Sequence, residues 1–555
     1  MKKNIIFYLL GLALIGVSFL SCVDERDFDF ERMTPIPINS NIHVNKLISA
    51  EVKLSDFFNI DSLEGLDLNL MHDAGGDYLE FSFSFDTILK PEVPNIEINP
   101  KNLALPTLNL GGTSYVGNIY YPELSQNMAS TSVDFPELEN QQRVDSLSFI
   151  EGSMNISVNS NINYPAYMII KSNSIKNKSN NSTYIDTIDL SPSKRKGIGQ
   201  NTINLSNYKM VVNQNKLLFE YRLCIMANGA LQDYNVSLNF SFNNLKYDVI
   251  YGVMGSAPSD FSNTIDIPFF KSSDISQIFE GGHFSLEKLF VNFITETNNG
   301  IPATINLTKL GVYDKEDNFH NIVTDESQRL LTVIPASNPN SIGTNTKNVN
   351  FDVNLLNLPP QKISHGGTLT LNPNKVNCFL VNEPYINVKA ELHIPFKGKL
   401  NDLDYETSFY NDLYGENQDA ETYANYISSA TIYLDLTNYF PISIGAELYG
   451  IDTNGNEIGK ILNINNGDDN ILINGANVDN NGNILTPVSK KTTIHANRTN
   501  VDILKRSKKL KIKLKLNSSS VNNVKPFIRF QKEFKIVVNA GVDLNISTTI
   551  NPFNN

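Results

Sequence analysis

Apolar and polar side chains alternate along most of this chain. The stretch 236–242 reads Val-Ser-Leu-Asn-Phe-Ser-Phe, and the stretch 432–436 reads Ile-Tyr-Leu-Asp-Leu. A period of two puts successive side chains on opposite faces of a strand. The pattern recurs in many windows separated by Asn, Gly and Asp, and helical periodicity is scarce. It therefore predicts antiparallel sheets with one face in water.

A weak internal repeat accompanies this pattern. Pro302 and Pro441 align at an offset of 139 residues, and each copy ends in a polar turn, 314–318 or 452–456. A third candidate is 163–169. We predict an all-β fold of tandem antiparallel, immunoglobulin-like β-sandwich domains in an elongated array. The predicted ranges are a signal peptide at 1–21, an acidic tether at 22–40, an N-terminal β domain at 41–135, and β-sandwiches at 136–255, 256–385 and 386–555.

Turn signals lie between the predicted strands. The pairs Asn454-Gly455 and Asn481-Gly482 are typical of two-residue hairpin turns, because both residue types tolerate positive φ. The polar segment 71–77 separates two apolar stretches and predicts a hairpin loop.

The N-terminus has the pattern of an exported lipoprotein. Lys2 and Lys3 precede an uncharged, mostly apolar stretch, 5–20, which is short for a membrane-spanning helix. Ser21 then places a small residue before Cys22, the arrangement that lipoprotein signal peptidase requires. We predict lipidation of Cys22; an ordinary secretory signal or a retained anchor is the alternative.

Acidic residues follow that cysteine directly. Asp24, Glu25 and Asp27 resemble the surface-export signal of Bacteroidota lipoproteins. The resemblance implies an outer-membrane protein, lipid-anchored and exposed at the cell surface; a solvated tether on the periplasmic side is the other interpretation.

The amino-acid composition argues against several kinds of partner and catalytic site. The 555 residues carry a net charge of −13, which argues against a nucleic-acid partner. Beyond Cys22 only Cys224 and Cys378 remain, either as one disulfide or, as we favour, as buried free thiols. The chain has no Trp and seven scattered His. No zinc or nucleophile motif is complete, so we predict no enzyme, no cofactor, no metal and no catalytic residue.

Two kinds of segment are candidates for a binding function. The loops 452–457 and 479–483 alternate oxygen-bearing side chains as calcium loops do, but they lack the EF-hand glycine and glutamate; we interpret them as turns, with weak calcium binding as the alternative. In a strand-like segment, Lys509, Lys511, Lys513 and Lys515 share one face. They either protect an edge or wet sheet face or contact an anionic partner.

Several stretches resemble uncharacterised Bacteroidota outer-membrane lipoproteins. They include 251–255, 265–270, 298–302, 440–458 and 505–516, so the resemblance covers about residues 150–545. It implies a β-rich lipoprotein of unassigned function and carries no catalytic residues.

These observations favour a binding or structural module held to the membrane through Cys22. The expected partner is an envelope or cell-surface protein. A glycan- or lipid-binding module and a fimbrial or adhesin component are the alternatives.

Overall fold

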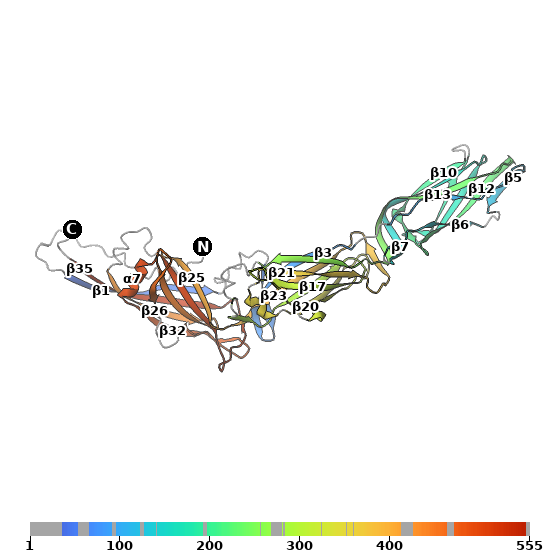
Figure 1. Cartoon of the computed structure of the whole chain (residues 1–555). Helices are drawn as coiled ribbons and strands as arrows, with labels where there is room; N and C mark the ends of the chain where they lie inside the picture. The colour runs from blue at the N-terminus through green and yellow to red at the C-terminus, as the bar shows by residue number, and fades with distance from the viewer. Residues whose placement is uncertain are drawn as a thin grey trace.

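The computed structural model describes residues 36–53, 66–91, 96–122, 127–139, 141–191, 197–255, 257–267, 280, 283–322, 325–350, 352–358, 360–411, 426–462 and 471–550. It consists of 65% strand and 5% helix, so the predicted all-β class is confirmed. Figure 1 shows a long rod in which three groups of strands follow one another. We call these groups the terminal, middle and distal modules.

The terminal module holds both the first and the last described strand. One sheet has the order β1-β35-β26-β32, and a second has the order β25-β33-β27-β28, with β29 also on β27. The bounds are β1 (Ile36–Lys53), β25 (Leu403–Tyr410), β26 (Ile427–Asn438), β27 (Ile442–Ile451), β28 (Glu457–Leu462), β29 (Ile471–Ile473), β30 (Asn477–Val478), β31 (Ile484–Thr486), β32 (Val488–Ala496), α7 (Arg498–Arg506), β33 (Lys509–Ser518) and β35 (Lys535–Ile550).

The middle module repeats this arrangement. Its sheets have the orders β2-β3-β23-β16-β20 and β14-β21-β17-β18, with β19 also on β17. The bounds are β2 (Leu66–Asp73), β3 (Gly76–Leu89), β14 (Ser259–Asp266), β16 (Phe290–Thr297), β17 (Ala303–Tyr313), β18 (Phe319–Asn321), η5 (Glu326–Gln328), β19 (Leu330–Val333), β20 (Gly343–Asn350), η6 (Val353–Asn357), β21 (Lys362–Leu371) and β23 (Ile386–Pro395).

The distal module follows the same plan, with its two sheets merged. The strands β4-β13-β7-β10 form one side, β12 and β8 with β5, β6 and β9 form the other, and β11 pairs with both β7 and β8. The bounds are β4 (Lys101–Ala104), β5 (Ser114–Tyr121), β6 (Ala129–Asp134), β7 (Arg143–Ser160), β8 (Ala166–Asn177), β9 (Thr183–Asp189), β10 (Ile198–Asn204), η3 (Leu205–Asn207), β11 (Tyr208–Val211), β12 (Lys216–Ala230) and β13 (Val236–Val253).

Equivalent strands therefore occupy equivalent places in all three modules. β1, β3 and β4 each pair with the last long strand of their module, namely β35, β23 and β13. A short helix, α7, η6 or η3, lies between corresponding strands and starts at an Asn or Asp whose side chain accepts a backbone N–H. The weak sequence repeat marks this relation, because β17 and β27 both begin directly after its prolines.

The modules are nested along the chain. The middle module is inserted between β1 and β25, and the distal module is inserted between β3 and β14. As a result, β1 and β35 lie at one end of the rod, and the distal module lies at the other (Figure 1).

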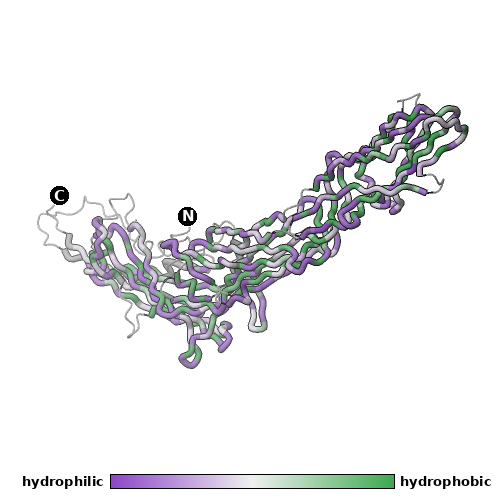
Figure 2. The backbone as a smooth tube through the Cα atoms, turned by 45° about the vertical axis from the view of Figure 1, so that its right-hand side comes forward, coloured by the Kyte–Doolittle hydropathy of each residue, from purple (hydrophilic) through white to green (hydrophobic). Residues whose placement is uncertain are grey.

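The sheets thus group the strands differently from the consecutive ranges 41–135, 136–255, 256–385 and 386–555. The strands of 41–135 are distributed over all three modules, since β1 pairs with β35, β3 with β23, and β5 with β12. Periodicity marks each strand but gives no information about its partner, and here many partners are distant in sequence. Figure 2 shows apolar and polar positions intermixed along the whole rod, as alternating strands require.

Three short strands connect neighbouring modules: β22 (Cys378–Val381), β24 (Lys397–Leu400) and β34 (Ile528–Arg529), with β15 (Phe284–Leu286) beside β24. β22 pairs with the end of β13, and β34 pairs with β24, which continues from β23. One large apolar core extends from the distal module through the middle module to Phe530 and Phe534. Two smaller clusters fill the terminal module.

The two described cysteines are both buried and free. Cys224 lies in the distal module and Cys378 in β22, so the free-thiol interpretation is the correct one and the alternative disulfide between them is not present.

Candidate functional site

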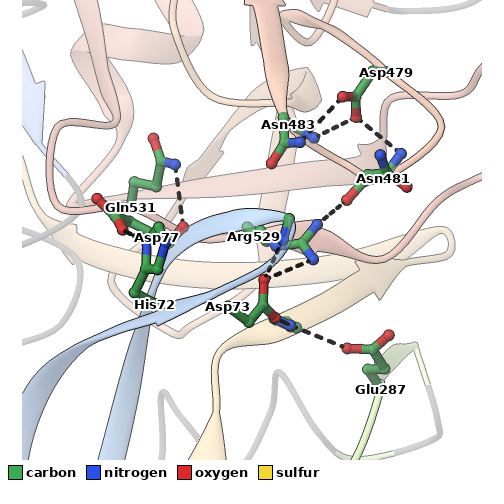
Figure 3. Close-up of polar contacts among 11 residues, drawn as sticks. His72, Asp73, Asp77, Glu287, Asp479, Asn481, Asn483, Arg529 and Gln531 are labelled. Atoms are coloured by element: carbon green, nitrogen blue, oxygen red, sulfur yellow. Dashed lines mark hydrogen bonds and ion pairs between the residues drawn. The ribbon is translucent and has the colours of Figure 1, made fainter.

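A cluster of polar and charged side chains lies where the middle and terminal modules meet. It joins the turn between β2 and β3, the first residue of β24, strand β34 and the turn between β30 and β31 (Figure 3). We call this cluster the polar joint. Its charged members are Asp73, Glu287, Lys397 and Arg529.

Lys397 is the buried centre of the polar joint, with only 6% of its surface exposed. Its ammonium group pairs with Asp73, lies 3.6 Å from the Glu287 carboxylate, and sits 4.3 Å from the centre of the Tyr78 ring. The hydrogen bond from Lys397 lowers the pKa of Asp73 to about 2, whereas burial raises the pKa of Tyr78. A buried cation therefore has two carboxylates and one aromatic face as partners.

Arg529 ties the same carboxylate to the terminal module. Its Nη2 donates to Asp73 Oδ1 at 3.2 Å, and its Nη1 donates to the carbonyl oxygen of Asn481. A Cβ at the neighbouring position Gly75 would lie 2.1 Å from Arg529 Nη2, so any larger residue there would displace the guanidinium. The guanidinium thus connects a hairpin of one module with a turn of the next.

The turn that presents Asn481 is held by its own aspartate. Asp479 Oδ1 accepts hydrogen bonds from the backbone N–H groups of Asn481 and Asn483 at 2.9 and 2.8 Å. Gly482 takes positive φ, and Asp479 N donates to Asn483 O. The loop therefore has three residues, whereas the Asn-Gly pair predicted two. Positive φ was expected at both residues of the pair, and in the structure Gly482 adopts it.

The same turn closes two other hairpins. Asp452 accepts from the N–H groups of Asn454 and Asn456, and Asp314 accepts from those of Glu316 and Asn318. In the loops 452–457 and 479–483, Oδ1 of each aspartate accepts backbone N–H groups, and Oδ2 accepts the side-chain amide of Asn456 or Asn483. Among the described residues, no group of three or more His, Cys, Asp or Glu side chains is placed to hold a metal ion.

The joint between the distal and middle modules has a different chemistry. Phe379 in β22 packs with Val249 and Ala336, and its ring lies 6.0 Å from that of Tyr251. Its carbonyl accepts the N–H of Gly300, where a Cβ would lie 2.3 Å from the Phe379 ring. We call this contact the apolar joint.

The lysines predicted as a contact for anionic partners lie in the terminal module. β33 is an inner strand between β25 and β27, so the edge interpretation of Lys509, Lys511, Lys513 and Lys515 is wrong and the wet-face interpretation agrees with the structure. An inner strand tolerates this charge because acidic partners face it from both sides. Lys511 lies 2.8 Å from Glu457, Lys513 lies 3.8 Å from Glu406, and Lys515 lies 3.8 Å from Asp402. Lys509 lies over the Tyr410 ring. An anionic-partner contact at this face stays a prediction.

The predicted lipidation and export residues, Cys22, Asp24, Glu25 and Asp27, lie outside the described residues. Within the described part of the chain, no helix is long and apolar enough to cross a membrane.

Sequence reasoning found the hairpin 71–77 and missed what it touches. The structure confirms the hairpin between β2 and β3, but Asp73 at its tip enters the polar joint. A usable signal was present, since Lys397 directly follows the apolar run 394–396 and Arg529 interrupts the apolar run 527–530. A charged residue at such a position is buried only when it is paired.

Comparison with known proteins gives only distant similarities to solved structures. No protein-family model and no curated protein matches this chain. One solved structure, described as a "putative secreted protein" from Parabacteroides distasonis, shares 11% identity over 91% of this chain and 99% of its own, with a TM-score of 0.25. Infectious bursal disease virus, strain Gx, gives 7% identity over 88% of this chain and 82% of its own, with a TM-score of 0.15.

Proposed function

We propose that this chain is a surface-anchored stalk that presents its distal module to a protein partner. The nested order of the modules carries the proposal. Because β1 and β35 pair with each other, an anchor attached ahead of β1 holds the terminal module near the membrane. The distal module, formed by the strands between Lys101 and Val253, then lies farthest from that membrane (Figure 1).

The length of the strands supports a spacer role. β7 and β13 have 18 residues each, which corresponds to nearly 60 Å at about 3.3 Å per residue. Three modules placed end to end give a reach of more than about 100 Å, enough to carry a binding surface well above the membrane.

The two joints support the same role. A spacer must keep its modules in line, and both joints combine strand pairing with well-packed side chains. The lipid anchor on Cys22, export signalled by Asp24, Glu25 and Asp27, and placement on the outer membrane are parts of the proposal.

An apolar cavity in the middle module is too small to enclose a lipid. In the middle module, a cavity lined by apolar residues including Ile267, Leu289 and Val312 has a volume of about 10 Å³, which is room for one water molecule at most. The adhesin alternative fits the same geometry as the stalk and differs only in the partner.

Epitope insertion on living cells tests the proposal. One variant carries a short tag between Gly111 and Gly112, ahead of β5 in the distal module, and the control carries it between Asn454 and Gly455 in the terminal module. We expect antibody to label the distal tag on intact cells and Cys22→Ala to release the protein from the membrane fraction. Labelling of the distal tag only after permeabilisation, or retention of Cys22→Ala in the membrane, would contradict the proposal.

A further inference from the structure

We infer that the edge strand β5 of the distal module pairs with β5 of a second copy, and that the two copies come from opposing membranes. β5 ends its sheet, and among the described strands only β12 pairs with it. Alternate residues of a strand point their N–H and C=O groups to opposite sides. Half of these groups in β5 therefore face away from β12, which leaves them available for a further strand.

The equivalent edges of the other modules provide the comparison. β14 and β25 each end their sheet and pair with the strand that corresponds to β12. Their register matches that of β6, and β5 continues the same edge beyond β6, along Leu223–Ala230 of β12. β14 carries Asp260 and Asp266, and β25 carries Asp404 and Glu406, whereas β5 reads Ser-Tyr-Val-Gly-Asn-Ile-Tyr-Tyr and has no charge. Charged residues on an edge oppose pairing with another chain. The neighbouring strand β6 ends in Asp134, so β5 is the part of this edge without such protection.

The side chains of β5 fit a contact. Ile119 and Tyr121 pack against the core, so Val116, Asn118 and Tyr120 share the outer face. Val116 is 75% exposed and Tyr115 is 46% exposed. Tyr is enriched at protein interfaces because it offers a large contact area together with a polar end.

Charge favours a second copy as the occupant. Residues 96–255 contain twelve acidic and twelve basic side chains, so this module has no net charge and the chain's −13 lies outside it. Two distal modules can approach without the repulsion that the rest of the rod would create. Because β5 is uncharged, a copy of itself also meets no like charge across the new strand pair.

The direction of the strand sets the arrangement. β5 runs along the long axis of the rod (Figure 1). Two identical strands that pair antiparallel are related by a two-fold axis across that direction, so the rods point in opposite directions. If the terminal modules face the membrane, as in the proposed function on which this arrangement rests, the paired copies bridge two surfaces.

Vesicle clustering tests this inference. The chain from residue 23, which retains every described residue, is attached through an N-terminal histidine tag to phosphatidylcholine vesicles containing nickel-chelating lipid, and clustering is followed by light scattering. We expect clustering that imidazole reverses. Because the tag replaces the natural anchor, the result does not depend on lipidation of Cys22.

Charge variants identify the edge. Val116→Lys/Asn118→Lys should leave vesicles dispersed, whereas Ser259→Lys/Ser262→Lys on the edge strand β14 of the middle module should cluster like the unaltered chain. Val116→Glu/Asn118→Glu should also disperse, and mixing lysine vesicles with glutamate vesicles should restore clustering, a result that misfolded variants cannot give.

Three outcomes overturn the inference. They are dispersed vesicles with the unaltered chain at saturating coverage, clustering that the lysine variant leaves unchanged, and a lysine–glutamate mixture that stays dispersed.

Discussion

The two joints of the rod use the same strand arrangement with opposite chemistry. At each, a short strand inserted near the end of one module pairs with the end of its neighbour: β22 with β13, and β34 with β24. The polar joint surrounds a buried ammonium group with carboxylates, whereas the apolar joint packs a phenylalanine against a glycine. Strand pairing therefore places the modules, and different side chains hold them there.

Removal of the Lys397 side chain should give the largest difference in stability between the two joints. Lys397→Ala removes the cation that Asp73 and Glu287 share. Loss of one member of a buried ion pair costs about 3–5 kcal/mol, and we place this site at the low end because Asp73 keeps Arg529 and both carboxylates are partly exposed. We expect faster hydrogen exchange in β24 and β34 and an unchanged rate in β22. Lys491→Ala, which removes an exposed lysine, is the matched control. Equal exchange in β24 and β34 of both variants would contradict a structural role for the ion pair.

The corresponding change at the apolar joint is Phe379→Ala. Truncation of a buried phenylalanine costs about 3 kcal/mol or more through lost packing and a new cavity, and we place this site at the low end because the ring retains 8% exposure. Hydrogen exchange should accelerate in β22 and stay constant in β34. Phe379→Leu, which keeps much of the volume, should recover more than half of the loss. A variant that loosens both joints equally would show that they do not act separately.

The sequence predicts the strands well because each strand is a local pattern. Alternation marks 236–242 and 432–436, and both lie in strands, β13 and β26. The joints are not local. Asp73 is 324 residues from Lys397 and 456 residues from Arg529, and only nesting of the modules brings the three together. Nor does the lysine pattern of 509–515 indicate whether its strand lies at an edge, since that depends on β25 and β27 on its two sides.

Acid should weaken the polar joint and leave the apolar joint unchanged, with a smaller effect than either substitution. The pKa of Asp73 is lowered from 3.8 to about 2 in the folded protein, so the folded state holds this proton less tightly than the unfolded state. The stability contributed by Asp73 is complete above pH 4 and is lost as the pH falls toward 2. Because the side chain is one-third exposed, we expect roughly 1 kcal/mol.

Asp73→Asn provides the comparison for acid. Between pH 4 and pH 2, exchange in β34 should accelerate in the unaltered chain relative to Asp73→Asn, while exchange in β22 should show no difference between the two proteins. A pH response of β34 that is identical in both proteins would assign the effect to other carboxylates.

High salt should have the smallest effect of these changes, and it should weaken the polar joint without weakening the apolar joint. At 1 M salt the screening length falls to about 3 Å, so the partly exposed Asp73 should lose a few tenths of a kcal/mol of its pairing with Arg529. The apolar joint should hold or tighten slightly, because burial of apolar surface does not depend on charge. Lys397 is buried and should be screened least, so salt should accelerate exchange in β34 by less than twofold and should leave β22 unchanged. An equal acceleration at both joints would mean that charge does not distinguish them, and the polar joint would then act through its strand pairing alone.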